Sequence, residues 1–120
     1  MKVVVIDYLQ LIKVSNNKMN KNDMIGLITR ELKILAMELG INIILLSQLN
    51  RSGQKDEPTM SNLRDSGNIE QDANVILLMY GEKEDNDINL SVAKNRNGQT
   101  GRLSLDIDYP TMRVKSADYI

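Results

Sequence analysis

The sequence contains no cysteine and no histidine, and these two absences exclude several classes of function. Without cysteine the chain can form no disulfide bond and use no thiolate. Such a chain suits a reducing compartment, and we expect a cytoplasmic location. Zinc sites built from Cys and His are excluded, and so is catalysis by a Ser-His-Asp triad.

Aromatic residues, excess charge and long apolar runs are scarce as well. Trp and Phe are absent and there are four Tyr, so a platform of rings for stacking nucleobases is not expected. The 15 basic and 16 acidic residues give a net charge of −1, so any contact with nucleic acid must come from locally placed Lys and Arg. No apolar run approaches the ~20 residues needed to span a bilayer.

The first half of the chain predicts a parallel β-α-β unit. With 120 residues, of which 42% are hydrophobic, the chain is one domain or a piece of one. Val3–Ile6 and Ile41–Leu46 are continuous apolar runs, typical of strands covered on both faces of a parallel sheet. Between them, Asp23–Leu39 repeats apolar residues at helical spacing, with Asn22 as the expected N-cap and Gly40 as the C-cap.

The second half predicts a long polar connection followed by more strands. Leu49–Asn68 is polar and long for a connection, and Val75–Tyr80 is a third apolar strand. Ile88–Ala93, Leu103–Ile107 and Met112–Val114 then predict an antiparallel tail, because turn-forming residues separate the first two. The fold class expected is therefore α/β.

Two polar residues follow the first two predicted strands. Asp7 ends the run Val3–Ile6, and Gln48 follows the run Ile41–Leu46. In open α/β sheets ligands bind outside the carboxyl ends of the strands, where a carboxylate can hold Mg²⁺ and an amide can contact a phosphate. Taken alone, Asp7 is better explained as a turn-capping residue, and for Gln48 a solvated strand end is equally plausible.

Two further segments carry cations beside small residues. Met60–Ala73 is a loop with Arg64 and Gly67 that runs into a short capped turn, able to offer a guanidinium and backbone N–H groups to phosphates. Lys94 and Arg96 lie two residues apart, on one side of a predicted strand, just before a turn. Each segment by itself is better explained as an ordinary solvated surface.

The order of these four segments resembles the DnaB-type replicative DNA helicases. They are Ile-Asp-Tyr-Leu-Gln-Leu, Leu-Ser-Gln-Leu-Asn-Arg, Leu-Arg-Asp-Ser-Gly-Asn-Ile-Glu-Gln-Asp-Ala and Ala-Lys-Asn-Arg-Asn-Gly, and the resemblance runs from Val3 to Leu105. It implies a partial RecA-like P-loop NTPase core of parallel strands with a crossover helix and an antiparallel extension. The implied function is that of an ATP-dependent, hexameric DNA helicase that moves on single-stranded DNA and unwinds duplex DNA.

The resemblance also implies roles for the residues that act on nucleotide. Asp7 matches the Walker B aspartate that holds Mg²⁺, and Gln48 matches the glutamine that links the γ-phosphate of ATP to the DNA-binding loops. Lys94 and Arg96 match a basic pair that acts on the ATP of the next identical subunit, with Arg96 as arginine finger.

For DNA the resemblance implies that Arg64, Asp65 and Gly67 follow the backbone of a single strand. A helicase loader and primase are the other partners that it implies.

The segment that would hold ATP is missing from the sequence. No Gly-x-x-x-x-Gly-Lys-[Ser/Thr] occurs, so the polyphosphate has no cradle and the chain alone should not hydrolyse ATP. Because Met1 leads almost directly into a strand, residues 1–120 are expected to be the truncated C-terminal half of a motor domain. By the resemblance, the absent P-loop strand would lie between Ile41–Leu46 and Val75–Tyr80, and its loss would leave two unpaired apolar edges.

Two alternatives remain open from the sequence. One is another RecA-like ATPase, a recombinase or phage paralogue, for which Lys94-Asn95-Arg96-Asn97-Gly98 would be atypical. The other is a non-enzymatic remnant that binds nucleic acid or caps a helicase ring.

Overall fold

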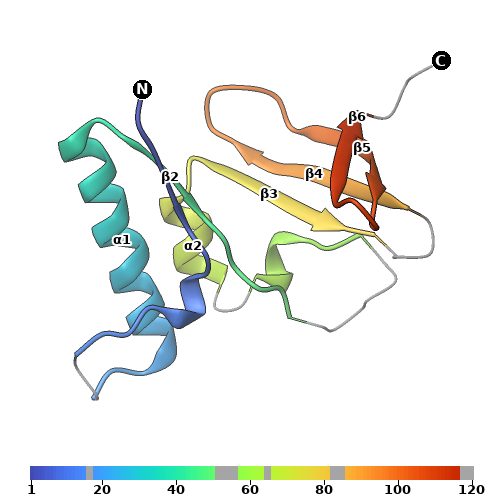
Figure 1. The fold of residues 1–120 in the computed structure, drawn as a ribbon. Helices are drawn as coiled ribbons and strands as arrows, with labels where there is room; N and C mark the ends of the chain where they lie inside the picture. Colours follow the sequence, from blue (N-terminus) through green and yellow to red (C-terminus); the bar gives the residue numbers. More distant parts are fainter. Residues whose placement is uncertain (16–17, 51–56, 64–65, 82–85, 117–120) are drawn as a thin grey trace. The chain divides into compact units, whose positions relative to one another are not determined.

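The computed structural model shows a mixed α/β fold with one parallel and one antiparallel sheet, as the sequence predicted (Figure 1). It describes residues 1–15, 18–50, 57–63, 66–81 and 86–116. The chain divides into two compact units, which are Met1–Ser52 with Ser61–Ala73, and Gly53–Met60 with Asn74–Ile120. Within the described ranges, no helix is long and apolar enough to cross a membrane.

The first unit contains the predicted strand-helix-strand arrangement. Strands β1 (Val3–Ile6) and β2 (Asn42–Leu45) pair in parallel, with Ile6 opposite Leu45, and α1 (Lys21–Leu39) connects them. Figure 1 shows α1 running beside this pair of strands. Parallel pairing brings the carboxyl ends of both strands to the same edge of the sheet.

The N-cap of α1 differs from the prediction, whereas the C-cap agrees with it. Asn20, not Asn22, caps the helix: its side-chain oxygen accepts from the backbone N–H of Asp23 at 2.9 Å. The Asn20 amide donates in return to the Asp23 carboxylate at 2.7 Å, so the acid three residues on makes Asn20 the better cap. Gly40 adopts the left-handed conformation, with φ 60° and ψ 40°, as expected of a C-cap glycine.

The polar connection after β2 contains more secondary structure than the sequence predicted. A 3-10 helix, η2 (Met60–Asn62), and a short helix, α2 (Ser66–Asp72), interrupt the range Leu49–Asn68, of which positions 51–56 and 64–65 lie outside the described residues. An isolated bridge between Leu49 and Leu63 closes the connection. The buried apolar residues of this unit are Leu9, Ile25, Ile28, Leu63 and Ile69.

The second unit is the predicted antiparallel tail joined to the third apolar strand. Strands β3 (Val75–Tyr80), β4 (Asp87–Asn95), β5 (Gly101–Asp108) and β6 (Arg113–Ser116) form one sheet in the order β3-β4-β5-β6. Strand β3 has the predicted bounds, whereas β4 and β5 are longer than predicted, because cross-strand hydrogen bonding extends pairing into the polar residues that flank each apolar run. The last strand begins after Met112, not at it.

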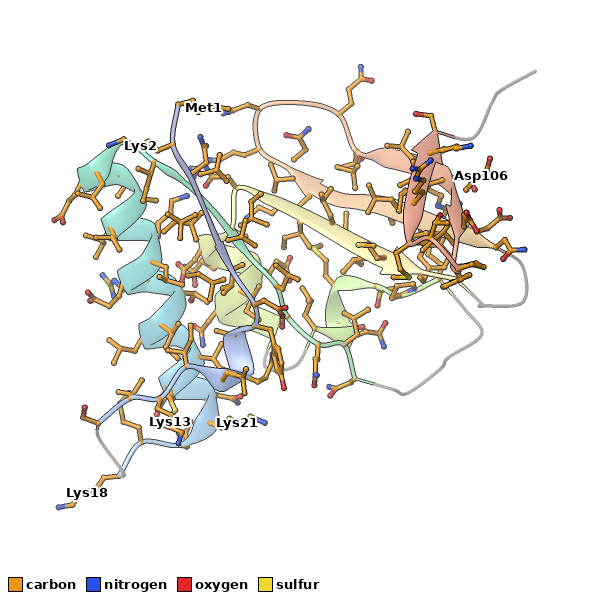
Figure 2. The ribbon with its side chains drawn as sticks, viewed as in Figure 1. Met1, Lys2, Lys13, Lys18, Lys21 and Asp106 are labelled. Carbon is orange, nitrogen blue, oxygen red and sulfur yellow. The ribbon has the colours of Figure 1, made fainter. Side chains whose placement is uncertain are left out.

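Charged residues face one another across this sheet. Asp106, labelled in Figure 2, stands on β5 opposite Asp87 of β4 and opposite Lys115 of β6. Like charges directly opposite weaken a strand pair, and the Lys115 cation on the other side offsets that repulsion.

Strand β1, which was predicted to be covered on both faces, is partly exposed, and so is the apolar strand β3. Val5 of β1 is 60% exposed and Leu77 of β3 is 52% exposed, although its neighbour Leu78 is only 2% exposed. Among the described residues β1 and β2 pair only with each other and β3 pairs only with β4, so β2 and β3 belong to different sheets, each with an unpaired edge.

Candidate functional site

Asp7 and Gln48 lie at the same edge of the parallel sheet. Asp7 directly follows β1, and the ladder continues one step beyond the strands, where the backbone N–H of Leu46 donates to the carbonyl of Ile6 at 3.0 Å. Gln48 follows two residues later, and the side chains of both Asp7 and Gln48 are exposed. The sequence-based expectation that parallel strands bring these two positions to one edge is therefore met by the backbone.

A buried turn joins the two strand ends. After Asp7 the chain enters the 3-10 helix η1 (Leu9–Leu11), and Leu9 is almost completely buried. The Leu9 N–H donates to the Leu46 carbonyl at 2.8 Å, so η1 is hydrogen-bonded directly to the end of β2. The peptide bond between Asp7 and Tyr8 is cis.

Gln10 is a residue of this edge that the sequence reading missed. Its amide nitrogen donates to the hydroxyl of Ser47 at 3.0 Å, and its amide oxygen accepts from the backbone N–H of Gln48 at 3.4 Å. The signal available in the sequence was an amide residue three positions after Asp7 in an otherwise apolar segment. Only the fold shows that this amide crosses to β2.

Exposed lysines surround the start of α1 in the same unit. Figure 2 shows Lys13, Lys18 and Lys21 in this region, and all three side chains are exposed. These three lysines place positive charge locally in a chain whose net charge is −1.

Of the three predicted DNA-binding residues, only Gly67 is described. It is the second residue of α2 and is exposed, whereas Arg64 and Asp65 lie outside the described residues. The position of Gly67 therefore depends on how α2 is held.

Polar contacts hold α2 against α1. The hydroxyl of Thr29, a buried residue of α1, lies 2.6 Å from a carboxylate oxygen of Asp72 and 3.3 Å from the Gly26 carbonyl. A hydroxyl has one proton, and the shorter contact to a charged acceptor is the stronger bond. The amide of Asn68 donates to the Asn22 carbonyl at 3.3 Å.

Gly26 leaves the space that the Asn68 side chain occupies. A Cβ placed on Gly26 would lie 2.8 Å from Cγ of Asn68, closer than packed atoms come. The absence of a side chain at this position of α1 therefore leaves room for the Asn68 side chain of α2.

We expect Thr29→Val to lower the free energy of unfolding by about 1–2 kcal/mol, since it keeps the volume but removes the donor to Asp72. Urea unfolding followed by circular dichroism measures the loss. Thr29→Ser keeps the hydroxyl and should cost less than half as much. Equal losses for the two variants would show that packing, not the bond to Asp72, fixes this contact.

Lys94 and Arg96 are not placed as the sequence predicted. Lys94 lies in β4 opposite Ile76, directly after a bulge at Ala93, since Leu77 pairs with Val92. Arg96 lies beyond the end of β4, in the turn. The prediction that both cations share one side of a strand is wrong, since strand alternation does not continue into a turn.

The turn that carries Arg96 is tightly defined. The Arg96 N–H donates to the Asn74 carbonyl at 3.0 Å, and the Asn95 amide donates to the Gln99 carbonyl at 3.2 Å. A Cβ on Gly98 would lie 2.5 Å from the Asn95 amide nitrogen, so a side chain there would displace the Asn95 amide from this position. The exposed guanidinium of Arg96 thus stands on a backbone fixed at both ends.

The candidate residues fall in different units. Asp7, Gln10 and Gln48 belong to the first unit, and Lys94 and Arg96 to the second. Among the residues that the structure describes, no group of three or more acidic side chains is placed to hold a metal ion.

Comparison with known proteins identifies replicative DNA helicases as relatives of this chain. A model of the DnaB-like helicase C terminal domain matches residues 1–116. Replicative DNA helicase DnaB of Geobacillus stearothermophilus is 42% identical over 114 residues, which cover 86% of this chain and 25% of that protein. The chain spans about a quarter of the length of the curated relatives it matches.

Two solved structures are similar along most of the chain. The ATPase domain of G40P superposes with a TM-score of 0.88 at 32% identity, over 97% of this chain and 44% of that chain. A DnaB-like replicative helicase, described with its interactions with primase, gives a TM-score of 0.80 at 36% identity, over 88% of this chain and 28% of that chain.

Proposed function

The chain belongs to the DnaB-like helicase C-terminal domain family, and on that premise we propose that it forms the C-terminal half of a RecA-like motor domain. The motor is that of an ATP-dependent, hexameric replicative helicase that moves on single-stranded DNA and unwinds duplex DNA. The match of residues 1–116 to the family is the observation that carries the proposal. We further propose that the helicase works in the cytoplasm.

Asp7 is the proposed contact to Mg²⁺ and ATP. Mg²⁺ at a nucleotide site takes one or two protein carboxylates and completes its shell with water and phosphate oxygens. A single exposed carboxylate at the end of β1 fits that donor set, whereas a closed protein cage would need more ligands than the described residues bring together. Mg²⁺ bound with ATP would neutralise charge on the phosphates.

The other nucleotide contacts divide between two subunits. Gln48 contacts the γ-phosphate from the edge of the sheet that also carries Asp7. Lys94 and Arg96 act on the ATP of the neighbouring identical subunit, where a cation can stabilise the charge of a transferring phosphoryl group. The fixed turn and the exposed Arg96 side chain support this role, since a finger must project from a rigid base.

Arg64, Asp65 and Gly67 are the proposed contacts to single-stranded DNA. The bonds from α1 to Asn68 and Asp72 support this role for Gly67, because they fix the helix in which it lies. Primase and a helicase loader are the proposed protein partners. A solved relative is described with its interactions with primase, which supports the first of these two.

The proposal predicts that this chain hydrolyses ATP only when the missing half is supplied. The chain alone should neither turn over nor measurably bind ATP with Mg²⁺, since it has no P-loop. Joined to the preceding part of the Geobacillus stearothermophilus helicase, it should give a hexamer whose ATPase responds to single-stranded DNA. We call this protein the joined helicase. Phosphate release and size-exclusion chromatography with light scattering measure the two properties.

Asp7→Asn in the joined helicase is the control, and it should abolish turnover while the hexamer remains. A folded hexameric joined helicase without ATPase would contradict the proposed function. Saturable ATP binding at micromolar concentration by the chain alone would contradict the prediction that this chain by itself does not bind ATP.

A further inference from the structure

The inference concerns Gln10 and rests on the proposed function. Gln48 lies three residues beyond the last residue of β2, so the regular ladder between β1 and β2 does not reach it. The direction of its exposed side chain therefore depends on the contacts that hold the backbone of Ser47 and Gln48. A group that contacts a phosphate must be held to within about 0.5 Å to be effective.

Contacts to Ser47 and Gln48 come from η1, and the bridge between Leu49 and Leu63 holds the residue that follows them. Leu9 is anchored by burial and by its N–H bond to the Leu46 carbonyl at 2.8 Å. The next residue, Gln10, is half-buried and contacts Ser47 at 3.0 Å and the Gln48 N–H at 3.4 Å. The bond to Ser47 has ordinary length, and the bond to Gln48 is long and adds less.

A glutamine suits this position because its neutral amide both donates and accepts. The amide nitrogen of Gln10 donates to the hydroxyl of Ser47, and its amide oxygen accepts from the backbone N–H of Gln48. One side chain therefore contacts two successive residues after the end of β2. These contacts connect the turn after Asp7 to the backbone that carries Gln48. A shift of η1 on one side would therefore be passed to Gln48 on the other.

We propose that Gln10 is a positioning residue for Gln48, linking the turn that follows the Mg²⁺-binding aspartate to the glutamine that contacts the γ-phosphate. Gln10 touches neither nucleotide nor metal in this proposal. It acts by fixing the Ser47–Gln48 backbone, through which the presence of ATP is reported to the DNA-binding loop.

Gln10→Met in the joined helicase tests the proposal, because methionine keeps the length of the side chain and removes both hydrogen bonds. We expect kcat in the presence of single-stranded DNA to fall about tenfold or more, since misplacing a catalytic contact by about 1 Å can cost up to ~10²-fold. The KM for ATP should stay within about twofold, because the loss is one of orientation and not of binding.

Three further variants separate positioning from a general structural effect. Ser47→Ala should lower kcat in the same direction, Ser47→Thr should keep the hydroxyl and most of the rate, and Gln10→Met with Ser47→Ala should be no worse than Gln10→Met alone. Leu11→Met is the matched control, since it changes the next residue of η1 without touching these bonds. An unchanged kcat for Gln10→Met would overturn the proposal, and so would a strictly additive double variant.

Hydrogen exchange in the isolated chain provides a second measurement. Gln10→Met should accelerate exchange of the Gln48 N–H about two- to tenfold, the loss of one modest hydrogen bond. The Leu9 N–H, bonded to Leu46, should exchange as before. Equal acceleration at both amides, or none at Gln48, would overturn the proposal. An unmodified joined helicase without ATPase would instead be a failure of the proposed function.

Discussion

Arg96→Ala in the joined helicase is expected to lower the turnover of ATP by roughly 10³- to 10⁵-fold. An arginine finger stabilises charge that is fully developed only in the transition state, so its removal lowers kcat much more than it weakens ATP binding. Affinity for single-stranded DNA should change little, because the proposed DNA contacts are Arg64, Asp65 and Gly67. Phosphate release gives the first quantity and fluorescence anisotropy of a labelled oligonucleotide the second.

Two other substitutions show whether the loss of ATP turnover is specific to the guanidinium at position 96. Arg96→Lys keeps the charge but loses the planar fork of the guanidinium, and it should recover only a small part of the rate. Arg102→Ala is the matched control: Arg102 is an exposed arginine of the same unit that pairs with Glu57. Its loss should leave turnover within about twofold, as expected for an exposed ion pair. A loss of less than tenfold for Arg96→Ala would show that Arg96 is an ordinary surface residue.

Mixed hexamers extend this prediction to the neighbouring subunit. A subunit with Arg96→Ala keeps its own Asp7, and a subunit with Asp7→Asn keeps its Arg96. Where an Arg96→Ala subunit holds ATP and its neighbour is an Asp7→Asn subunit that supplies Arg96, one complete site forms between them. Mixing the two inactive proteins should therefore restore a measurable fraction of the ATPase. No recovery, with both variants folded and hexameric, would argue against a shared site.

The backbone of the candidate site was largely predictable from the sequence, whereas its side-chain contacts were not. Continuous apolar runs predicted β1 and β2, and the parallel crossover then required Asp7 and Gln48 to share one edge. The contacts of Gln10 could not be predicted, because an amide after a strand has many partners within reach. The position of η1 against the end of β2 places Ser47 within hydrogen-bonding distance of Gln10.

Two errors in the prediction have simple physical causes. Asn20 and Asn22 are equally good caps by residue type, and the reciprocal bond to Asp23 decides between them. Arg96 was placed in a strand because it stands two residues after Lys94, the spacing of one strand face, whereas β4 ends at Asn95 and the turn begins there. In both cases a local polar contact, not hydrophobic periodicity, sets the boundary.

The last prediction concerns the exposed face of β3. The side chains of this strand alternate between nearly complete burial, as at Ile76 and Leu78, and half exposure, as at Leu77. The chain covers 44% of the G40P ATPase domain, so more than half of that domain has no counterpart here. We infer that the missing half covers the face to which Leu77 belongs.

Leu77→Glu should therefore be tolerated in the isolated chain and costly in the joined helicase. In the isolated chain a half-exposed position should change the free energy of unfolding by no more than about 1 kcal/mol. In the joined helicase the same carboxylate would be buried without a partner, and the cost should reach about 4 kcal/mol. Urea unfolding of the two proteins, each with and without the substitution, gives the comparison.

Leu78→Glu is the matched control on the neighbouring residue of β3. Leu78 is already 2% exposed in the isolated chain, so its replacement should be severely destabilising in both proteins. The contrast between the two positions separates burial supplied by this chain from burial supplied by the missing half. If Leu77→Glu cost the same small amount in the joined helicase, the exposed face of β3 would be a solvated surface.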